Sequence, residues 1–244
     1  MPSTVARKHG KSMGAGRDYL VGTRARWLIV TAALAAVLYA ALWIGYAMQW
    51  TWLADVDAAG LAGPYRYGSA HPGWVTAWDV FCTVLGPFAF RLLALVMIVV
   101  ALVRRRWRIA WYLVLTIELS AVITEAAKFL VDRPRPSTAL VHALSTSFPS
   151  GHALGVMVSV LTLLALAWPA LRPNLRAWWV AAGVLVIVAI GVGRVVLNVH
   201  HPSDVLAGWA LGYVWFAAVF LLYPPYPSAI TAADETPVAP GTAR

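Results

Sequence analysis

Cysteine is almost absent from this chain of 244 residues, in which Cys82 is the only thiol. An intramolecular disulfide and a metal site built from several cysteines are therefore both excluded. Cys82 lies in an apolar stretch, and we expect it to be a small packed residue.

Charged residues are scarce as well. They make up 12% of the chain and hydrophobic residues 61%, whereas soluble domains average about a quarter charged residues. The net charge of +9 does not indicate a nucleic-acid partner, because the basic residues stand in short clusters between apolar runs. The 13 tryptophans fit a protein with two membrane interfaces. Composition therefore predicts an integral membrane protein.

Six apolar segments have about the length that a helix needs to cross a bilayer, which is about 20 residues. We expect an all-α, polytopic membrane protein with six transmembrane helices, near 27–54, 80–103, 109–127, 151–171, 177–196 and 205–223. The segment 55–79 contains Gly, Pro and charged residues and is predicted to be a loop. The chain divides into a basic amino-terminal segment (1–26), a membrane domain (27–223) and a tail (224–244) that is predicted to be disordered.

Lys and Arg are unevenly distributed between the two sides of this layout. Six lie in segment 1–26, four in 104–108 and two in 172–176, all on one side. The positive-inside rule therefore predicts that both termini are cytoplasmic. The stretches 128–150 and 194–204 then lie on the outer face of the plasma membrane.

Three polar clusters fall in these two outward stretches: Lys128 with Arg135-Pro136, then Pro149-Ser150-Gly151-His152, then Arg194 with His200 and Asp204. A phosphoryl group in transfer carries charge on three oxygens, which fixed cations stabilise. Lys128, Arg135 and Arg194 supply three such cations. Ser150 is a good N-cap for the helix that follows, and Gly151 allows close approach of the backbone to an anion.

The two histidines of these clusters suit opposite tasks. Asp204 follows His200 by four residues and can fix its tautomer, which leaves the other ring nitrogen free to attack phosphorus. His152 can then donate a proton to the leaving oxygen. A metal site formed by His152, His200 and Asp204 is the alternative, but three nearby cations would repel a divalent ion.

Together these clusters resemble the signature of the type 2 phosphatidic acid phosphatase superfamily, the lipid phosphate phosphatases: Lys-x6-Arg-Pro, Pro-Ser-Gly-His and Ser-Arg-x5-His-x3-Asp. The resemblance implies a helical bundle around the site, a phosphohistidine on His200, His152 as general acid and Asp204 as its partner. It implies no metal and no cofactor. It also implies five phosphate ligands, namely Lys128, Arg135, Ser150, Gly151 and Arg194. Gly193 stands where the signature has Ser, so one hydroxyl donor is missing.

The expected substrate is a lipid-linked phosphomonoester or pyrophosphate, of the isoprenyl pyrophosphate, phosphatidylglycerol phosphate or phosphatidic acid type. One alternative is a lipid phosphotransferase that uses the same site. A haloperoxidase-like use of the pocket with vanadate is disfavoured by the membrane spans. A non-catalytic lipid-phosphate transporter is disfavoured because binding alone needs no nucleophile.

Four further polar residues adjoin these clusters. Glu125 lies one turn before Lys128 and is expected to pair with it. The roles of Asp132 and Arg133 stay open. His201 neighbours the expected nucleophile, and we expect its ring to point elsewhere and to have no catalytic role.

Overall fold

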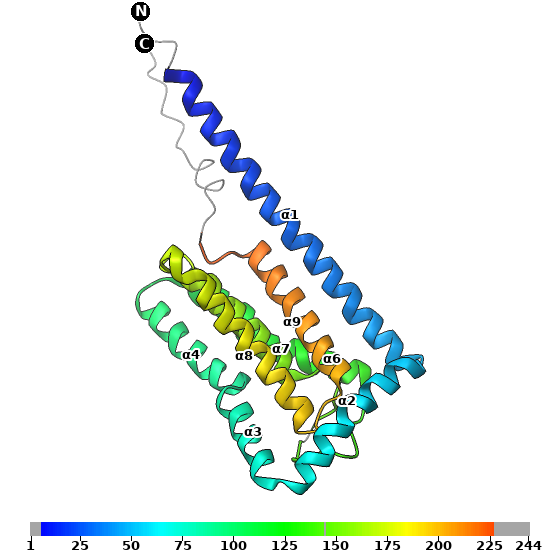
Figure 1. Ribbon diagram of the computed structural model, residues 1–244. Coiled ribbons are helices and arrows are strands. Elements are labelled where there is room, and N and C mark those ends of the chain that lie inside the picture. The colour runs from blue at the N-terminus through cyan, green and yellow to red at the C-terminus, as the bar shows by residue number, and fades with distance from the viewer. Residues whose placement is uncertain (1–5, 144, 227–244) are drawn as a thin grey trace, which may run out of the picture.

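Helices form all of the regular structure in the computed structural model, which describes residues 6–143 and 145–226, those before 25 as backbone only (Figure 1). The first half contains α1 (Ala6–Ala47), α2 (Thr51–Ala70), α3 (Pro72–Val84), α4 (Pro87–Val103), α5 (Trp107–Leu113), the π-helical turn η1 (Val114–Glu118) and α6 (Leu119–Val131). The second half contains α7 (Gly151–Ala167), the 3-10 turn η2 (Pro173–Leu175), α8 (Arg176–Val196) and α9 (Pro202–Leu222).

Four stretches of the described chain are long and apolar enough to cross a membrane: Ala25–Ala47, Pro72–Val103, Pro173–Val196 and Pro202–Leu222. The apolar helix α7 is shorter. Large apolar side chains stand exposed along the outside of α1, α4 and α8, among them Leu34, Val96 and Leu185. Water-soluble monomers rarely expose extended apolar surface. The exposed faces of these helices are therefore suited to lipid.

The segment 55–79 is helical, so the prediction of a loop there was wrong. It belongs to α2 and to the start of α3, and the first apolar helix ends at Ala47 instead of continuing to residue 54. The glycines in this segment mark close packing. A Cβ atom on Gly60 would lie 2.6 Å from Pro202 Cγ, and one on Gly68 would lie 2.5 Å from Leu140 Cδ1.

Helix α5, the π-turn η1 and helix α6 form one continuous helical stretch. In a π-turn the hydrogen bonds span five residues, which widens the helix and frees carbonyl groups from their usual partners. Trp215 on α9 compensates, because its Nε1 donates to Leu115 O at 3.1 Å and to Thr116 O at 3.2 Å. The wide turn is therefore held against α9.

Glycines bring α9 very close to α7. A Cβ atom on Gly208 would lie 2.6 Å from Ser150 O, and one on Gly212 would lie 2.9 Å from Leu154 O. Both neighbours are backbone atoms and cannot rotate away. The close contact places the first turn of α7 beside the first turn of α9, and both turns belong to the expected site.

With α3 and α4 taken as one stretch, and α5 and α6 as another, successive long stretches alternate in direction, so their connections gather at two ends of the bundle (Figure 1). The turn after α4, the turn η2 and the end of α9 lie at one end. Helix α2, the segment 132–150 and the link 197–201 lie at the other end, which brings together all three clusters of polar residues.

The first residues of the predicted tail pack on the bundle. Arg108 Nε donates to Pro224 O at 2.7 Å, and the Tyr226 hydroxyl donates to Leu166 O at 2.7 Å. The prediction of disorder was therefore wrong for 224–226. Residues 1–5 and 227–244 lie outside the described residues.

We expect Gly208→Ala to lower the melting temperature of the detergent-solubilised protein. Overpacking against fixed backbone costs about 1–3 kcal/mol, and for a chain of this size each kcal/mol shifts the melting temperature by about 2–4 °C. Gly73→Ala is the control, because no atom lies within 4 Å of a Cβ atom at Gly73. Equal melting temperatures for the two variants would contradict the close contact of α7 with α9.

Candidate active site

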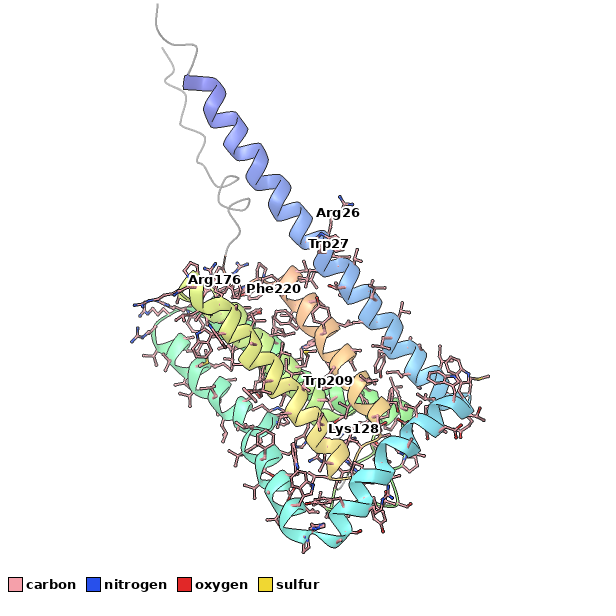
Figure 2. The ribbon with its side chains drawn as sticks, viewed as in Figure 1. Arg26, Trp27, Lys128, Arg176, Trp209 and Phe220 are labelled. Atoms are coloured by element: carbon pink, nitrogen blue, oxygen red, sulfur yellow. The ribbon has the colours of Figure 1, made fainter. Side chains whose placement is uncertain are left out.

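The predicted site residues come together where α6 and α8 end and α7 and α9 begin. Lys128 lies in the last turn of α6 and Arg194 in the last turn of α8. His200 lies in the link between α8 and α9, and Asp204 in the first turn of α9. Figure 2 shows Lys128 at the end of the bundle opposite to Arg176. Residues from four helices are thus brought together only by the fold.

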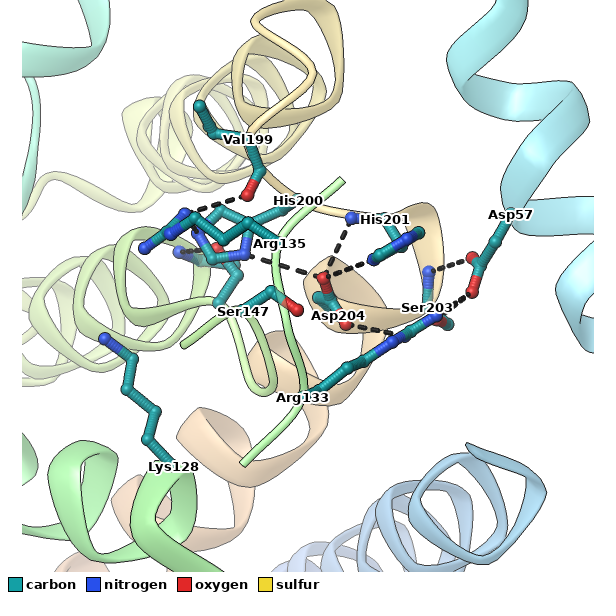
Figure 3. Close-up of polar contacts among 12 residues, drawn as sticks. Asp57, Lys128, Arg133, Arg135, Ser147, Val199, His200, His201, Ser203 and Asp204 are labelled. Carbon is teal, nitrogen blue, oxygen red and sulfur yellow. Dashed lines mark hydrogen bonds and ion pairs between the residues drawn. The ribbon is translucent and has the colours of Figure 1, made fainter. Parts of the chain in front are cut away.

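The imidazole of His200 is buried, with its two nitrogens in different surroundings. Nε2 lies 3.2 Å from a terminal nitrogen of Arg135, and Nδ1 faces Asp204 (Figure 3). A guanidinium can only donate hydrogen bonds, so Nε2 must present its lone pair and the ring proton must sit on Nδ1. The side of His200 that faces the cations therefore carries the nucleophilic electron pair.

Asp204 is held mainly by groups other than His200. Its Oδ2 accepts from the His201 backbone N at 2.8 Å and lies 3.2 Å from His201 Nδ1, and its Oδ1 accepts from Arg133 at 2.7 Å. The distance from Oδ2 to His200 Nδ1 is 3.6 Å, longer than a hydrogen bond. The ring of His201 thus points at Asp204, and the expectation that it points elsewhere was wrong.

Lys128, Arg135 and Arg194 lie close to one another, the two arginines lie beside His200, and none of the three forms an ion pair with a buried carboxylate among the described residues. Lys128 pairs with Glu125 at 3.3 Å, as predicted, but the side chain of Glu125 is 67% exposed. Arg135 donates to the carbonyl oxygens of Ser145 and Val199 at 2.6 and 2.8 Å. In the part of the chain that the structure describes, neither Arg135 nor Arg194 forms an ion pair, and the buried Nε of Arg194 has no hydrogen-bond partner. Such a cluster favours an anionic ligand.

The turn that begins α7 borders this cluster. Ser150 is the N-cap, as predicted, and its side chain accepts from Ala153 N at 3.5 Å, while its own N–H donates to Asp204 O at 2.9 Å. A Cβ atom on Gly151 would lie 3.8 Å from Lys128 Nζ, and one on Gly86 would lie 3.3 Å from the Nε2 of His152. Gly151 thus keeps the backbone open beside the Lys128 amine, and His152 packs at the junction of α3 and α4.

Arg133 contrasts with the other cations because two buried carboxylates neutralise it. It bonds Asp204 Oδ1 at 2.7 Å and Asp57 Oδ2 at 2.8 Å. Asp57 was missed because it lay in the supposed loop. The signal was present: Leu53, Asp57 and Leu61 recur every four residues and are all buried on one face of α2.

The surroundings of His200 keep its imidazole neutral. The pKa of His200 is lowered from its ordinary value of 6.5 to about 4. Burial is the main cause, the positive charges of Arg194 and Arg135 act in the same direction, and Asp204 opposes them. At neutral pH the lone pair on Nε2 is therefore available for attack.

Comparisons with known proteins identify a family and several similar chains. The model of the PAP2 superfamily matches residues 109–226. The chain is similar to phosphatidylglycerophosphatase B of Bacillus subtilis, with 32% identity over 153 residues that cover 60% of this chain and 74% of that protein. It is also similar to an undecaprenyl-diphosphatase of Sulfolobus acidocaldarius, with 33% identity over 116 residues, 45% of this chain and 52% of that protein. The chain therefore spans only about half of the second relative.

The fold is similar to a solved structure. The crystal structure of a transmembrane PAP2 type phosphatidylglycerolphosphate phosphatase from Bacillus subtilis superposes with a TM-score of 0.62 and 22% sequence identity. The match covers 80% of this chain and 94% of that one.

The departure at Gly193 has a steric reason. A Cβ atom on Gly193 would lie 2.5 Å from Cys82 Sγ and 2.9 Å from Trp78 Cε3. Cys82 is fully buried, as expected for a packed residue. Helix α3 therefore occupies the space that a serine side chain would need.

We expect Gly193→Ser to destabilise the protein by about 1–3 kcal/mol, the usual cost of overpacking, and to lower its melting temperature. Cys82→Ala in the same chain should recover part of this loss, because it removes the nearer of the two obstructing atoms while Trp78 remains. Cys82→Ala alone is the matched reference. A serine at 193 that leaves the melting temperature unchanged would show that α3 does not limit this position.

Proposed function

The chain belongs to the PAP2 superfamily, and on that premise we propose that, as a lipid phosphate phosphatase, it hydrolyses a lipid-linked phosphomonoester or pyrophosphate through a phosphohistidine on His200. The observation that carries the proposal is the buried lone pair of His200 Nε2, directed toward cations that form no ion pair with a buried carboxylate among the described residues. Phosphate is the ligand that would complete this cluster and bring phosphorus to the lone pair.

In the first step Nε2 of His200 attacks phosphorus, and the bond from phosphorus to the lipid oxygen breaks. His152 gives its proton to the departing oxygen. The imidazole keeps the proton on Nδ1 and gains positive charge, which Asp204 stabilises. The present separation of 3.6 Å between Nδ1 and Oδ2 closes as that charge develops.

In the second step water attacks the phosphorus of the phosphohistidine. His152, now neutral, accepts a proton from this water, and the N–P bond breaks to release phosphate and to return the lone pair to Nε2. Lys128, Arg135 and Arg194 hold the equatorial oxygens in both steps, together with the hydroxyl of Ser150 and the backbone N–H of Gly151. This supply of fixed positive charge is the main need of phosphoryl transfer.

The same cations support a reaction without a metal. Three positive side chains close to one another at the site repel a divalent ion, and they already supply the electrostatic stabilisation that a metal provides in other phosphatases.

For the substrate, the two curated relatives bear names that refer to phosphatidylglycerophosphate and to undecaprenyl diphosphate. Both substances carry a terminal phosphate on a hydrophobic body. We infer a substrate of this class, with its phosphate at His200 and its hydrocarbon in the bilayer.

For the topology, we propose six crossings of the plasma membrane, made by α1, α3 with α4, α5 with α6, α7, α8 and α9. The basic turns at 104–106 and 172–175 lie at the end of the bundle opposite to the site (Figure 1), and the positive-inside rule assigns that end to the cytoplasm. Exposed aromatic side chains accompany α2 and the start of α3 at the site's own end: Trp50, Trp52, Tyr65, Tyr67 and Trp74. Such residues favour the headgroup region, so the site opens at the outer interface.

We expect the purified protein to release phosphate from isoprenyl pyrophosphate, phosphatidylglycerol phosphate or phosphatidic acid in excess EDTA. His200→Ala should reduce the rate on the order of 10³-fold or more, since removal of a covalent nucleophile costs at least this much. His71→Ala is the matched control, because His71 is exposed at the start of α3.

Three outcomes would contradict parts of the proposal. Loss of activity in EDTA would contradict metal independence. Full activity of His200→Ala would show that His200 is not the nucleophile. Transfer of phosphate to a second lipid in preference to water would identify a phosphotransferase that uses the same site.

We also expect kcat/KM to fall on the acid side near pH 4, because protonation of His200 below its pKa of about 4 removes the attacking lone pair. The measurement is a pH profile over the range in which the melting temperature is constant. An acid limb near 6.5, the ordinary pKa of histidine, would show that His200 is not held neutral by its surroundings.

A further inference from the structure

A buried ionic cluster links the expected catalytic pair to a helix outside the matched family region. It consists of Asp57 on α2, Arg133 after α6, and Ser203 and Asp204 at the start of α9 (Figure 3). The family model matches residues 109–226, so Asp57 lies outside it. All four side chains are buried.

Both terminal nitrogens of the Arg133 guanidinium are hydrogen-bonded, and one face of the group lies over an aromatic ring. One terminal nitrogen donates to Asp204 Oδ1 at 2.7 Å and to Ser203 Oγ at 2.8 Å, and the other donates to Asp57 Oδ2 at 2.8 Å. Its carbon lies 4.8 Å from the centre of the Tyr46 ring. A planar guanidinium held in this way transmits the position of one carboxylate to the other.

Asp57 also holds the first turn of α9 directly. Its Oδ1 accepts from Ser203 N at 2.9 Å, and its Oδ2 accepts from Ser203 Oγ at 2.6 Å. Asp57 is 2% exposed and Asp204 is fully buried, so water cannot replace either contact. Asp57 therefore fixes both the backbone that carries Asp204 and the cation that bonds its carboxylate.

The cluster also sets the charge that His200 meets. Arg133 alone would neutralise Asp204, because one positive charge would face one negative charge. With Asp57 present, one positive charge is shared between two carboxylates. Asp204 thus keeps part of its negative charge for the imidazolium that forms when His200 is phosphorylated.

We propose that Asp57 is a positioning residue for catalysis: through Arg133 and Ser203 it holds Asp204 in place and leaves its charge available to His200. This inference rests on the proposed function. Asp57 touches no reacting group. Its loss should therefore weaken the binding of the transition state much more than the binding of the ground state.

The first test compares Asp57→Asn with Asp55→Asn in steady-state hydrolysis. Both substitutions remove one carboxylate from α2, and Asp55 is exposed. We expect Asp57→Asn to lower kcat about 10- to 100-fold, as loss of an outer partner of a catalytic group commonly does, with KM within about twofold. Asp55→Asn should match the wild-type protein. Equal kcat for the two variants would overturn the proposal.

The second test needs no turnover. Orthovanadate accepts the lone pair of His200 Nε2 into a fifth coordination position and so imitates the transition state, whereas inorganic phosphate imitates the ground state. We expect Asp57→Asn to raise, by about 10-fold or more, the vanadate concentration that is needed to stabilise the protein against heating. The phosphate concentration needed for the same stabilisation should stay unchanged. A purely structural role would lower the melting temperature without changing the ratio of the two affinities.

Two further variants cover the case in which Asp57→Asn does not fold. Arg133→Lys keeps the charge but cannot bridge two carboxylates, so it should show the same selective loss of vanadate affinity. Asp57→Glu keeps a carboxylate at this position and should therefore retain part of the vanadate affinity that Asp57→Asn loses. Unchanged vanadate affinity in a folded Arg133→Lys protein would overturn the proposal. A wild-type protein that binds vanadate but hydrolyses no lipid would instead contradict the proposed function and leave this test decisive.

Discussion

Repulsion among three cations is the constraint around which this end of the bundle is built. Lys128, Arg135 and Arg194 are held near the imidazole of His152, and the chain gives Lys128 and Arg135 hydroxyl and carbonyl oxygens in place of buried carboxylates. Such an arrangement costs folding free energy, because like charges are brought out of water together. Rigid packing of α6 and α8 against α7 must hold it, and an anionic ligand relieves the cost.

The neighbouring cation, Arg133, is a buried guanidinium that the chain pairs fully with carboxylates. Arg133 lies two residues before Arg135 and has two carboxylates and a hydroxyl. The two arginines have the same chemistry and nearly the same place in the sequence. Their different partners separate an arginine whose charge is neutralised by carboxylates from one whose charge has no carboxylate partner among the described residues and is available to the proposed phosphate.

Much of the site could be predicted from the sequence because its residues lie in short clusters with fixed spacing. Ser150 as an N-cap and the pairing of Lys128 with Glu125 follow from local helix geometry, and the structure confirms both. Asp57 could not be placed in this way, since its partners are more than 70 residues away. The error over segment 55–79 had a related cause. Its glycines serve contacts with Pro202 and Leu140, which only the folded chain reveals.

Because of the π-turn η1, the helical stretch that leads to Lys128 should tolerate the loss of one residue at some positions and not at others. A π-turn accommodates one extra residue while the helix on either side keeps its facing. Deleting a single residue within Val114–Glu118 would return the turn to α-helix and leave Lys128 directed at the site. Deleting one between η1 and Lys128 would rotate that side chain by about 100°, the angle per residue of an α-helix. Among homologous chains, single-residue gaps should therefore be accepted within Val114–Glu118 and excluded between Leu119 and Lys128.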